Sequence, residues 1–248
     1  LIYFVAIVAL MLGLSRMPNA DSIALVVIGG VGFWLFFRHQ HHRDHPLIDV
    51  SLFYTNRVFT FSCIASIIMY TATFANIVLM SLYLQYLKGL SPSQAGIILM
   101  AQPIAMAVMS PLAGRLSDHR APRTLASAGM AGTCVGLFFL GTMSTETTIP
   151  VIVTYLFMTG VGFSFFSSPN ANAIMGSVSQ SQYGTAGGTV ATVRVVGQMA
   201  RMGVVSLVLA ITIGPVQITP AIYDGLATAI LLSFFISASL CLPGVFLS

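Results

Sequence analysis

The stretch PLAGRLSDHRAPRTLASAG, residues 111–129, places Arg115, Asp118, Arg120 and Arg123 within nine positions. Charged residues are rare elsewhere, because the whole chain of 248 residues contains only ten Lys and Arg and six Asp and Glu residues. Soluble domains carry about 25% charged residues, whereas 6% are charged here and 56% are hydrophobic. The composition excludes a water-soluble fold. We therefore expect the charged stretch to be a short turn between two helices that cross a membrane.

Apolar runs on both sides of this turn have the length of membrane-spanning helices, because a bilayer core about 30 Å thick needs roughly 20 apolar residues. No strand-like alternation competes with them. The sequence thus predicts an all-α polytopic membrane protein with eight transmembrane helices, the first of them truncated. The chain begins Leu-Ile-Tyr without a Met, so we expect a fragment. The runs cover residues 1–14, 21–37, 58–86, 93–114, 124–141, 148–169, 183–210 and 225–247.

The cations divide unequally between the two faces that the loops would occupy. The face with loops 38–57 and 115–123 holds six arginines, and the opposite face holds only Arg16 and Lys88. The positive-inside rule then places the arginine-bearing loops and both ends of the chain in the cytoplasm of a multi-pass cell-membrane protein. The six arginines are Arg38, Arg43, Arg57, Arg115, Arg120 and Arg123.

Other classes of partner find little support in the composition. Ten Lys and Arg residues without a basic helix face do not indicate nucleic acid binding. The three cysteines lie in apolar runs without metal spacing, so we expect buried core residues. The run RHQHHRDH, residues 38–45, is interpreted as a solvated linker, with a weak metal site as the alternative. Residues 46–53 after it are typical of a short interfacial segment. No cofactor or metal is expected.

Two helix starts share one pattern. SPSQAG at 91–96 and SQSQYG at 179–184 both place a serine three residues before a glutamine, as in a capping box. Each would begin the second helix of a three-helix group, on opposite sides of the membrane. This arrangement is expected of an inverted-topology repeat, although chance use of a common cap explains it equally well.

The opening stretch resembles the G-x-L-a-D-r-x-G-r-r hairpin of the major facilitator superfamily. Gly114, Leu116, Asp118 and Arg123 match this pattern, whereas His119 and Ala121 stand where arginine and glycine are usual. Gly114 is expected to let the helix end approach its neighbour, and Asp118 to accept hydrogen bonds from backbone N–H groups or from an arginine. If position 121 needs a positive φ, alanine there would cost up to about 1 kcal/mol. The resemblance implies a conformational role for Gly114, Arg115, Asp118 and Arg123.

Four further stretches, residues 45–59, 82–96, 160–178 and 183–199, are similar to the fourteen-spanner drug:proton antiporter branch of that superfamily. The resemblance implies that residues 46–248 form the C-terminal six-helix half of a transporter, built of two inverted three-helix repeats. Residues 1–45 would hold the two central linker helices and a cytoplasmic loop. The partners implied are the lipid bilayer, a small-molecule substrate and the missing N-terminal six-helix half.

Polar residues inside the spans are candidates for a substrate pathway, because polar groups avoid lipid and usually face a partner helix or a watery cavity. Thr73, Asn76, Met80 and Tyr83 recur at spacings of three, four and three and share one helix face. Gln102 lies in the next span. Helix–helix packing is the alternative interpretation for all five. Pro103 and Pro111 are expected to kink the span that contains Gln102.

The seventh span carries a second polar stripe, Arg194, Gln198 and Arg201. Arg194 matches an arginine that the family has near the cytoplasmic end of this helix. This match implies a conformational role through loop carbonyls or carboxylates of the other half. Arg201 either faces an aqueous cavity, with Gln198 beside it on the pathway, or extends outward to the membrane surface.

The function that the resemblance implies is secondary active transport, with efflux of drugs or small amphipathic compounds by alternating access and with proton coupling. No acid lies deep within the last six spans, so these residues name no proton carrier. A membrane-embedded enzyme would need a dyad that the spans do not offer. The remaining alternatives are a non-transporting scaffold or receptor-like protein and a non-functional remnant.

Overall fold

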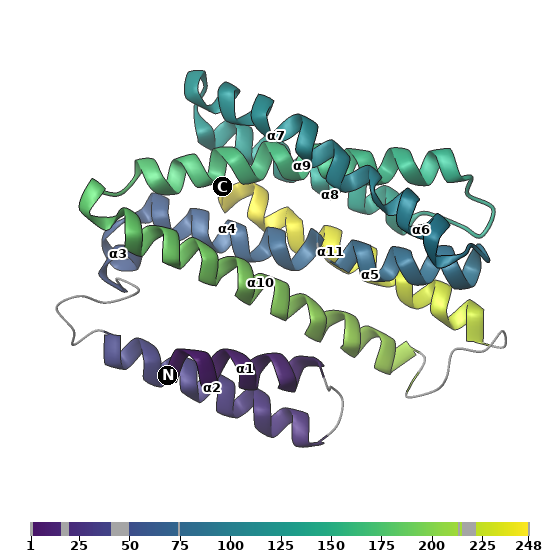
Figure 1. Cartoon of the computed structure of the whole chain (residues 1–248), viewed down its shortest axis with the longest axis horizontal. Helices are drawn as coiled ribbons and strands as arrows, with labels where there is room; N and C mark the ends of the chain where they lie inside the picture. The colour runs from purple at the N-terminus through teal and green to yellow at the C-terminus, as the bar shows by residue number, and fades with distance from the viewer. Residues whose placement is uncertain are drawn as a thin grey trace.

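The computed structural model describes residues 2–15, 20–40, 50–73, 75–212, 214 and 222–247, and these residues are helical apart from short turns. Six helices are long and apolar enough to cross a membrane (Figure 1). Each helix begins and ends within a few residues of a predicted span, except that Pro92–His119 and Ile149–Gly176 continue further at their C-terminal ends. They are Arg57–Leu87, Pro92–His119, Pro122–Gly141, Ile149–Gly176, Gln180–Thr212 and Tyr223–Leu247.

Among the described residues, one of the six spans is interrupted, the second. The first span comprises α4 (Arg57–Thr73), α5 (Ala75–Leu82) and a π-helical turn, η1 (Tyr83–Leu87), and residue 74 lies outside the described residues. The second consists of α6 (Pro92–Leu99) and α7 (Ala101–His119). The others are α8 (Pro122–Gly141), α9 (Ile149–Gly176), α10 (Tyr183–Thr212), which follows the 3-10 turn η2 (Gln180–Gln182), and α11 (Tyr223–Leu247).

The first part of the chain forms a helical hairpin of α1 (Ile2–Ser15) and α2 (Ala20–Gln40), which lies beside α10 (Figure 1). Its membrane-length character is not established: α1 has 14 residues and the apolar part of α2 covers Asp21–Gly32. The eight-span count therefore stays a prediction. Helix α2 continues through Arg38, whose guanidinium lies 5.5 Å from the centre of the Trp34 ring.

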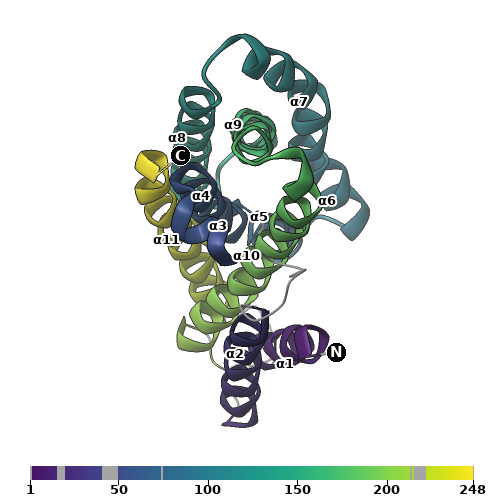
Figure 2. The same ribbon diagram turned by 90° about the vertical axis from the view of Figure 1, so that its left-hand side faces the viewer.

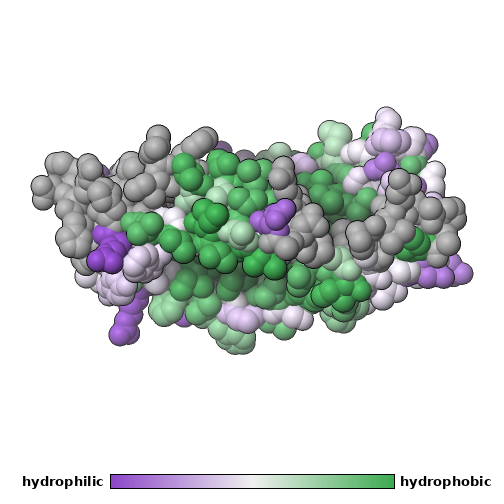
Figure 3. Space-filling model, turned by 90° about the horizontal axis from the view of Figure 1, so that it is seen from below, coloured by the Kyte–Doolittle hydropathy of each residue, from purple (hydrophilic) through white to green (hydrophobic). Residues whose placement is uncertain are grey.

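The helix ends alternate between the two ends of the bundle. Figure 2 views the end that carries α3 (Val50–Thr55), the start of α4 and the end of α11, with α9 inside an arc of α7, α8 and α4. We call this end the arginine-rich end, because Arg57, Arg115, Arg120 and Arg123 lie there. Figure 3 shows a hydrophobic band across the middle of one face and hydrophilic residues at both ends, as expected for a chain that crosses lipid.

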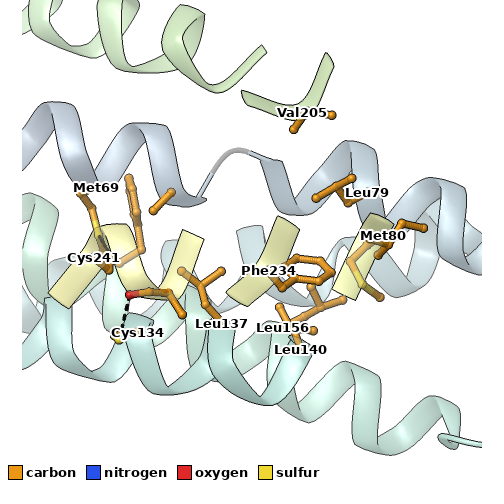
Figure 4. Packing of buried hydrophobic residues seen from close by; sticks show 14 of the residues in the cluster. Met69, Leu79, Met80, Cys134, Leu137, Leu140, Leu156, Val205, Phe234 and Cys241 are labelled. Carbon is orange, nitrogen blue, oxygen red and sulfur yellow. Dashed lines mark hydrogen bonds between the residues drawn. The ribbon is translucent and has the colours of Figure 1, made fainter. Parts of the chain in front are cut away.

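The core lies where α4, α5, α8, α9 and α11 meet. Met69, Leu137, Leu140 and Phe234 are fully buried in it (Figure 4). All three cysteines are buried and free, and the Cys134 thiol donates a hydrogen bond of 3.3 Å to the carbonyl of Ala238. The cysteines thus pack as small apolar residues, as predicted.

Both predicted capping boxes are present, at opposite ends of the bundle. The amide of Gln94 donates to the Ser91 hydroxyl over 3.3 Å, and the Ser91 amide donates to the Gln94 side chain over 3.0 Å. Ser179 and Gln182 repeat the arrangement before α10. The caps explain where these helices begin, and the inverted repeat stays a prediction.

One expectation for the charged turn is wrong. A Cβ added at Gly114 would meet nothing within 4 Å, so this glycine does not serve close approach to a neighbouring helix. Position 121 does not need a positive φ: Ala121 has a φ of −55°, an ordinary value for alanine, so the cost considered for this position does not arise. The turn needs no glycine at this position, because Pro122 begins α8 directly.

Candidate functional site

A cavity of about 210 Å³ lies in the middle of the bundle, between the first two spans and α9. It brings together Thr73 and Gln102, two residues that the sequence singled out on different helices. The remaining wall is apolar, so the cavity offers two hydrogen-bonding side chains on an otherwise apolar surface. Its lining residues are Thr73, Ile77, Gln102, Pro103, Met106 and Phe163.

Proline explains why the second span is interrupted beside this cavity. Pro103 has no N–H to donate to the carbonyl of Leu99, and α6 ends at that residue. Helix α7 then begins at Ala101, after a one-residue turn at Met100, and it continues without a break through Pro111, where a kink was also predicted. The backbone at Gln102 is held from the other side, because a Cβ at Gly160 would lie 2.5 Å from the Gln102 carbonyl oxygen. The position of Gln102 in the cavity wall is thus fixed by α9.

The predicted stripe Thr73, Asn76, Met80 and Tyr83 divides in the structure. Thr73 lines the cavity, and its hydroxyl donates to the carbonyl of Met69. Met80 and Tyr83 are buried in the core, where the Tyr83 hydroxyl donates to the Ser144 carbonyl over 2.5 Å. Three of the four side chains therefore have an evident packing or hydrogen-bonding partner.

Asn76 is the exception. Its side chain is fully buried, and neither its amide nitrogen nor its amide oxygen has a hydrogen-bond partner among the described residues. An amide buried without partners destabilises a structure by about 1–3 kcal/mol, and buried polar groups in proteins are nearly always paired. Asn76 lies in sequence between Thr73 and Ile77, which line the cavity, but its own side chain is not part of the wall.

Arg194 is connected to the cavity by two aromatic contacts: it lies over the Tyr70 ring, which packs against Phe163 in the cavity wall. Its guanidinium lies 5.5 Å from the centre of the Tyr70 ring, and the Tyr70 ring packs edge-on against Phe163 at 5.6 Å. Helices α4 and α10 are in close contact there, since the Thr71 hydroxyl donates to the Gly197 carbonyl over 3.2 Å. Arg194 was expected to contact loop carbonyls or carboxylates; the contact observed is with an aromatic face on α4.

The other predicted residues lie elsewhere. Gln198 and Arg201 are half-buried on α10 and do not line this cavity. Arg115 and Asp118 are exposed near the end of α7, and Gly114 precedes them. Arg123 lines a second cavity, at the arginine-rich end. The structure therefore brings two of the seven proposed pathway residues to the first cavity and none of the gating residues.

Two asparagines of α9 that the sequence did not single out bind neighbouring helices. Asn170 donates to the Ser62 carbonyl over 3.2 Å and to the Ser66 hydroxyl over 2.7 Å. Asn172 donates to the Ser117 hydroxyl over 2.5 Å, at the end of α7. The sequence held a sign of this role: SSPNAN, residues 167–172, is a polar run within a 28-residue apolar helix.

Comparison with known proteins gives a consistent result. The model of the Major Facilitator Superfamily matches residues 62–247. Riboflavin transporter RibZ of Clostridioides difficile is 27% identical over 194 residues, covering 78% of this chain and 42% of RibZ.

Two further relatives extend the comparison. Uncharacterized transporter YebQ of Escherichia coli is 30% identical over 190 residues, covering 77% of this chain and 40% of YebQ. Drug efflux pump JefA of Mycobacterium tuberculosis is 26% identical over 228 residues, covering 91% of this chain and 44% of JefA. The chain thus spans less than half the length of these relatives.

Proposed function

Because the chain belongs to the major facilitator superfamily, we propose that it forms part of a secondary active transporter that exports drugs or related small amphipathic compounds by alternating access. The observation that carries this proposal is the cavity beside the interruption of the second span at Met100, since a transport site is expected near the membrane midplane where helices are broken. Among the relatives, JefA is named as a drug efflux pump and RibZ as a riboflavin transporter.

The cavity suits an amphipathic cargo. Ile77, Met106 and Phe163 offer flat or adaptable apolar contacts, and Thr73 and Gln102 offer two polar groups. The unpaired amide of Asn76 would gain partners if cargo or water reached it. Binding would then relieve a destabilised side chain, and the cavity would favour compounds with both apolar and hydrogen-bonding parts.

We also propose the arrangement of the whole transporter. Residues 46–248 would be the C-terminal half, residues 1–45 the central linker helices, and a further six-helix half would complete the pathway. Both ends of the chain would lie in the cytoplasm, with the arginine-rich end toward the inner leaflet of the cell membrane. Proton coupling would rest on the other half, because the four acids among the described residues, Asp21, Asp118, Glu146 and Asp224, lie at helix ends or in turns.

Transport in membrane vesicles tests this function. The full-length product of the gene would be placed in everted vesicles with an imposed proton gradient, and the uptake of ethidium, lincomycin and riboflavin would be measured. We expect gradient-dependent uptake of at least one compound. We expect Gln102→Leu to reduce that uptake several-fold, and Gln85→Leu, which changes a glutamine outside the cavity, to leave it unchanged.

Two results would contradict the proposal. Uptake equal to that of empty vesicles for all three compounds would favour a scaffold or a remnant. Uptake that persists unchanged in a chain carrying both Asn76→Leu and Arg194→Gln would show that the pathway lies elsewhere.

A further inference from the structure

A larger cavity, of about 500 Å³, opens at the arginine-rich end of the bundle. Four helices that are distant in the sequence contribute to it: α4, α8, α9 and α11. None of its described lining residues is acidic. The lining residues are Arg57, Val58, Phe61, Ser62, Arg123, Ala126, Asn170, Ala173, Phe246 and Leu247.

The two arginines lie at one depth in the membrane. Arg57 is the first residue of α4, and Arg123 is the second residue of α8. Both helices are membrane-length apolar spans, so both guanidinium groups lie where the hydrocarbon core gives way to lipid headgroups. Guanidinium groups bind phosphate oxygens with paired hydrogen bonds. The positive ends of the α4 and α8 helix dipoles add to the attraction for an anion at this depth.

Polar and apolar residues of the wall divide the cavity into two parts. Ser62 and Asn170 are buried, and the Asn170 amide already bonds to the Ser62 carbonyl and the Ser66 hydroxyl, so this part of the wall is rigid. Val58, Phe61 and Phe246 are exposed large apolar side chains of the same cavity. The cavity thus combines two exposed arginines with a rigid polar wall and an apolar surface.

We propose that this cavity binds an anionic phospholipid, with the phosphate headgroup between Arg57 and Arg123 and the first part of an acyl chain on Phe61 and Phe246. An anionic phospholipid joins a negatively charged headgroup to an apolar chain. Basic pockets between helices near the membrane surface are suited to such headgroups. The bound lipid links α4, α8 and α11 at the arginine-rich end and stabilises their packing. The site is separate from the small cavity in the middle of the bundle.

Lipid titration of the purified full-length protein tests this site. The protein would be delipidated in detergent, and its thermal unfolding would be followed during addition of phosphatidylglycerol, phosphatidylcholine or inorganic phosphate. We expect phosphatidylglycerol to raise the unfolding temperature in a saturable manner, and phosphatidylcholine and inorganic phosphate to raise it much less. A phosphate effect equal to that of phosphatidylglycerol would overturn the lipid assignment in favour of an anion site.

Single substitutions test whether the lipid binds at this cavity. We expect Arg57→Gln to weaken phosphatidylglycerol binding about fivefold, as loss of one surface arginine implies. Arg115→Gln, at an exposed position of the same end that does not line the cavity, serves as the matched control and retains wild-type binding. If Arg57→Gln fails to fold, Phe61→Ala and native mass spectrometry of the wild-type protein provide the second measurement. Equal binding of phosphatidylglycerol by the wild type, Arg57→Gln and Phe61→Ala, or equal retention of phosphatidylcholine, would overturn the proposal.

Discussion

The contact between α8 and α9 and the region around the small cavity differ in how much space they leave. We call the first the glycine contact, defined by Gly129, Gly136 and Gly162. A Cβ at Gly129 would lie 2.4 Å from the backbone of Phe165, and one at Gly162 would lie 2.5 Å from the amide of Thr133. Small residues let membrane helices approach this closely. No side chain fits between the two backbones.

The cavity region has the opposite character. It contains one helix interruption, at Met100, about 210 Å³ of empty space and the amide of Asn76, which has no hydrogen-bond partner among the described residues. An interrupted helix and unmade hydrogen bonds lower the free energy needed for a local rearrangement. We infer that α8 and α9 form a rigid support and that the first two spans change shape against it.

The largest effect is expected from crowding the glycine contact. Gly129→Ala should lower the free energy of unfolding by about 1–3 kcal/mol, because the added methyl group forces two backbones apart. Gly96→Ala is the matched control: this helical glycine has nothing within 4 Å of a Cβ, so its replacement should be neutral or stabilising by up to about 1 kcal/mol. Thermal unfolding in detergent measures both. Equal shifts would remove the distinction between the two regions.

Asn76→Leu is expected to stabilise the protein, whereas Gly129→Ala destabilises it. Leucine removes an unpaired buried amide while keeping a similar volume, so the free energy of unfolding should rise by about 1–3 kcal/mol. Uptake into vesicles should fall in the same variant, since the group that relaxes on cargo binding is lost. A stable variant with full uptake would contradict the role given to this side chain, and a destabilised variant would show that the amide has a partner.

Asn170→Ala provides the contrast to Asn76→Leu, because the Asn170 side chain makes hydrogen bonds to a neighbouring helix. We expect the free energy of unfolding to fall by about 0.6–1.7 kcal/mol, the range of interhelical hydrogen bonds in membranes. The effect should become smaller, without disappearing, when Ser66→Ala is already present, because the bond to the Ser62 carbonyl remains; a double-mutant cycle measures the difference. Additive losses would mean that the bond between these two side chains contributes nothing.

The smallest effect is expected at Arg194. Its guanidinium is exposed and lies over the Tyr70 ring, an arrangement that contributes about 0.5–1 kcal/mol at exposed sites. Arg194→Gln should reduce stability by this amount, and Tyr70→Leu should abolish the difference between arginine and glutamine at position 194. A difference that survives Tyr70→Leu would assign the role of Arg194 to another contact.

Much of the fold followed from local features of the sequence. The apolar runs located the six membrane-length helices, the Ser91 and Ser179 capping boxes located two helix starts, and Pro103 located an interruption. Each of these depends on a few neighbouring residues or on the length of one apolar run. Such features are read from a single segment without knowledge of what packs against it.

The features that depend on contacts between distant segments were predicted less well. Gly114 was expected to allow close approach, yet a Cβ there would meet nothing, whereas one at Gly129 or Gly162 would meet a neighbouring backbone; only the packing of α8 on α9 decides this. The helical stripe grouped Thr73, Asn76 and Tyr83, but it could not distinguish the paired side chain of Tyr83 from that of Asn76, which has no partner among the described residues.

The central claim is that cargo occupies the small cavity, and substrate protection of a cysteine tests it most directly. Ile77 lines the cavity and is 42% exposed, whereas its neighbour Val78 is 37% exposed and does not line it. In a full-length protein without its native cysteines, we predict that a transported compound slows maleimide labelling of Ile77→Cys several-fold and leaves Val78→Cys unaffected. Labelling of Ile77→Cys at the same rate with and without saturating transported compound would contradict the claim.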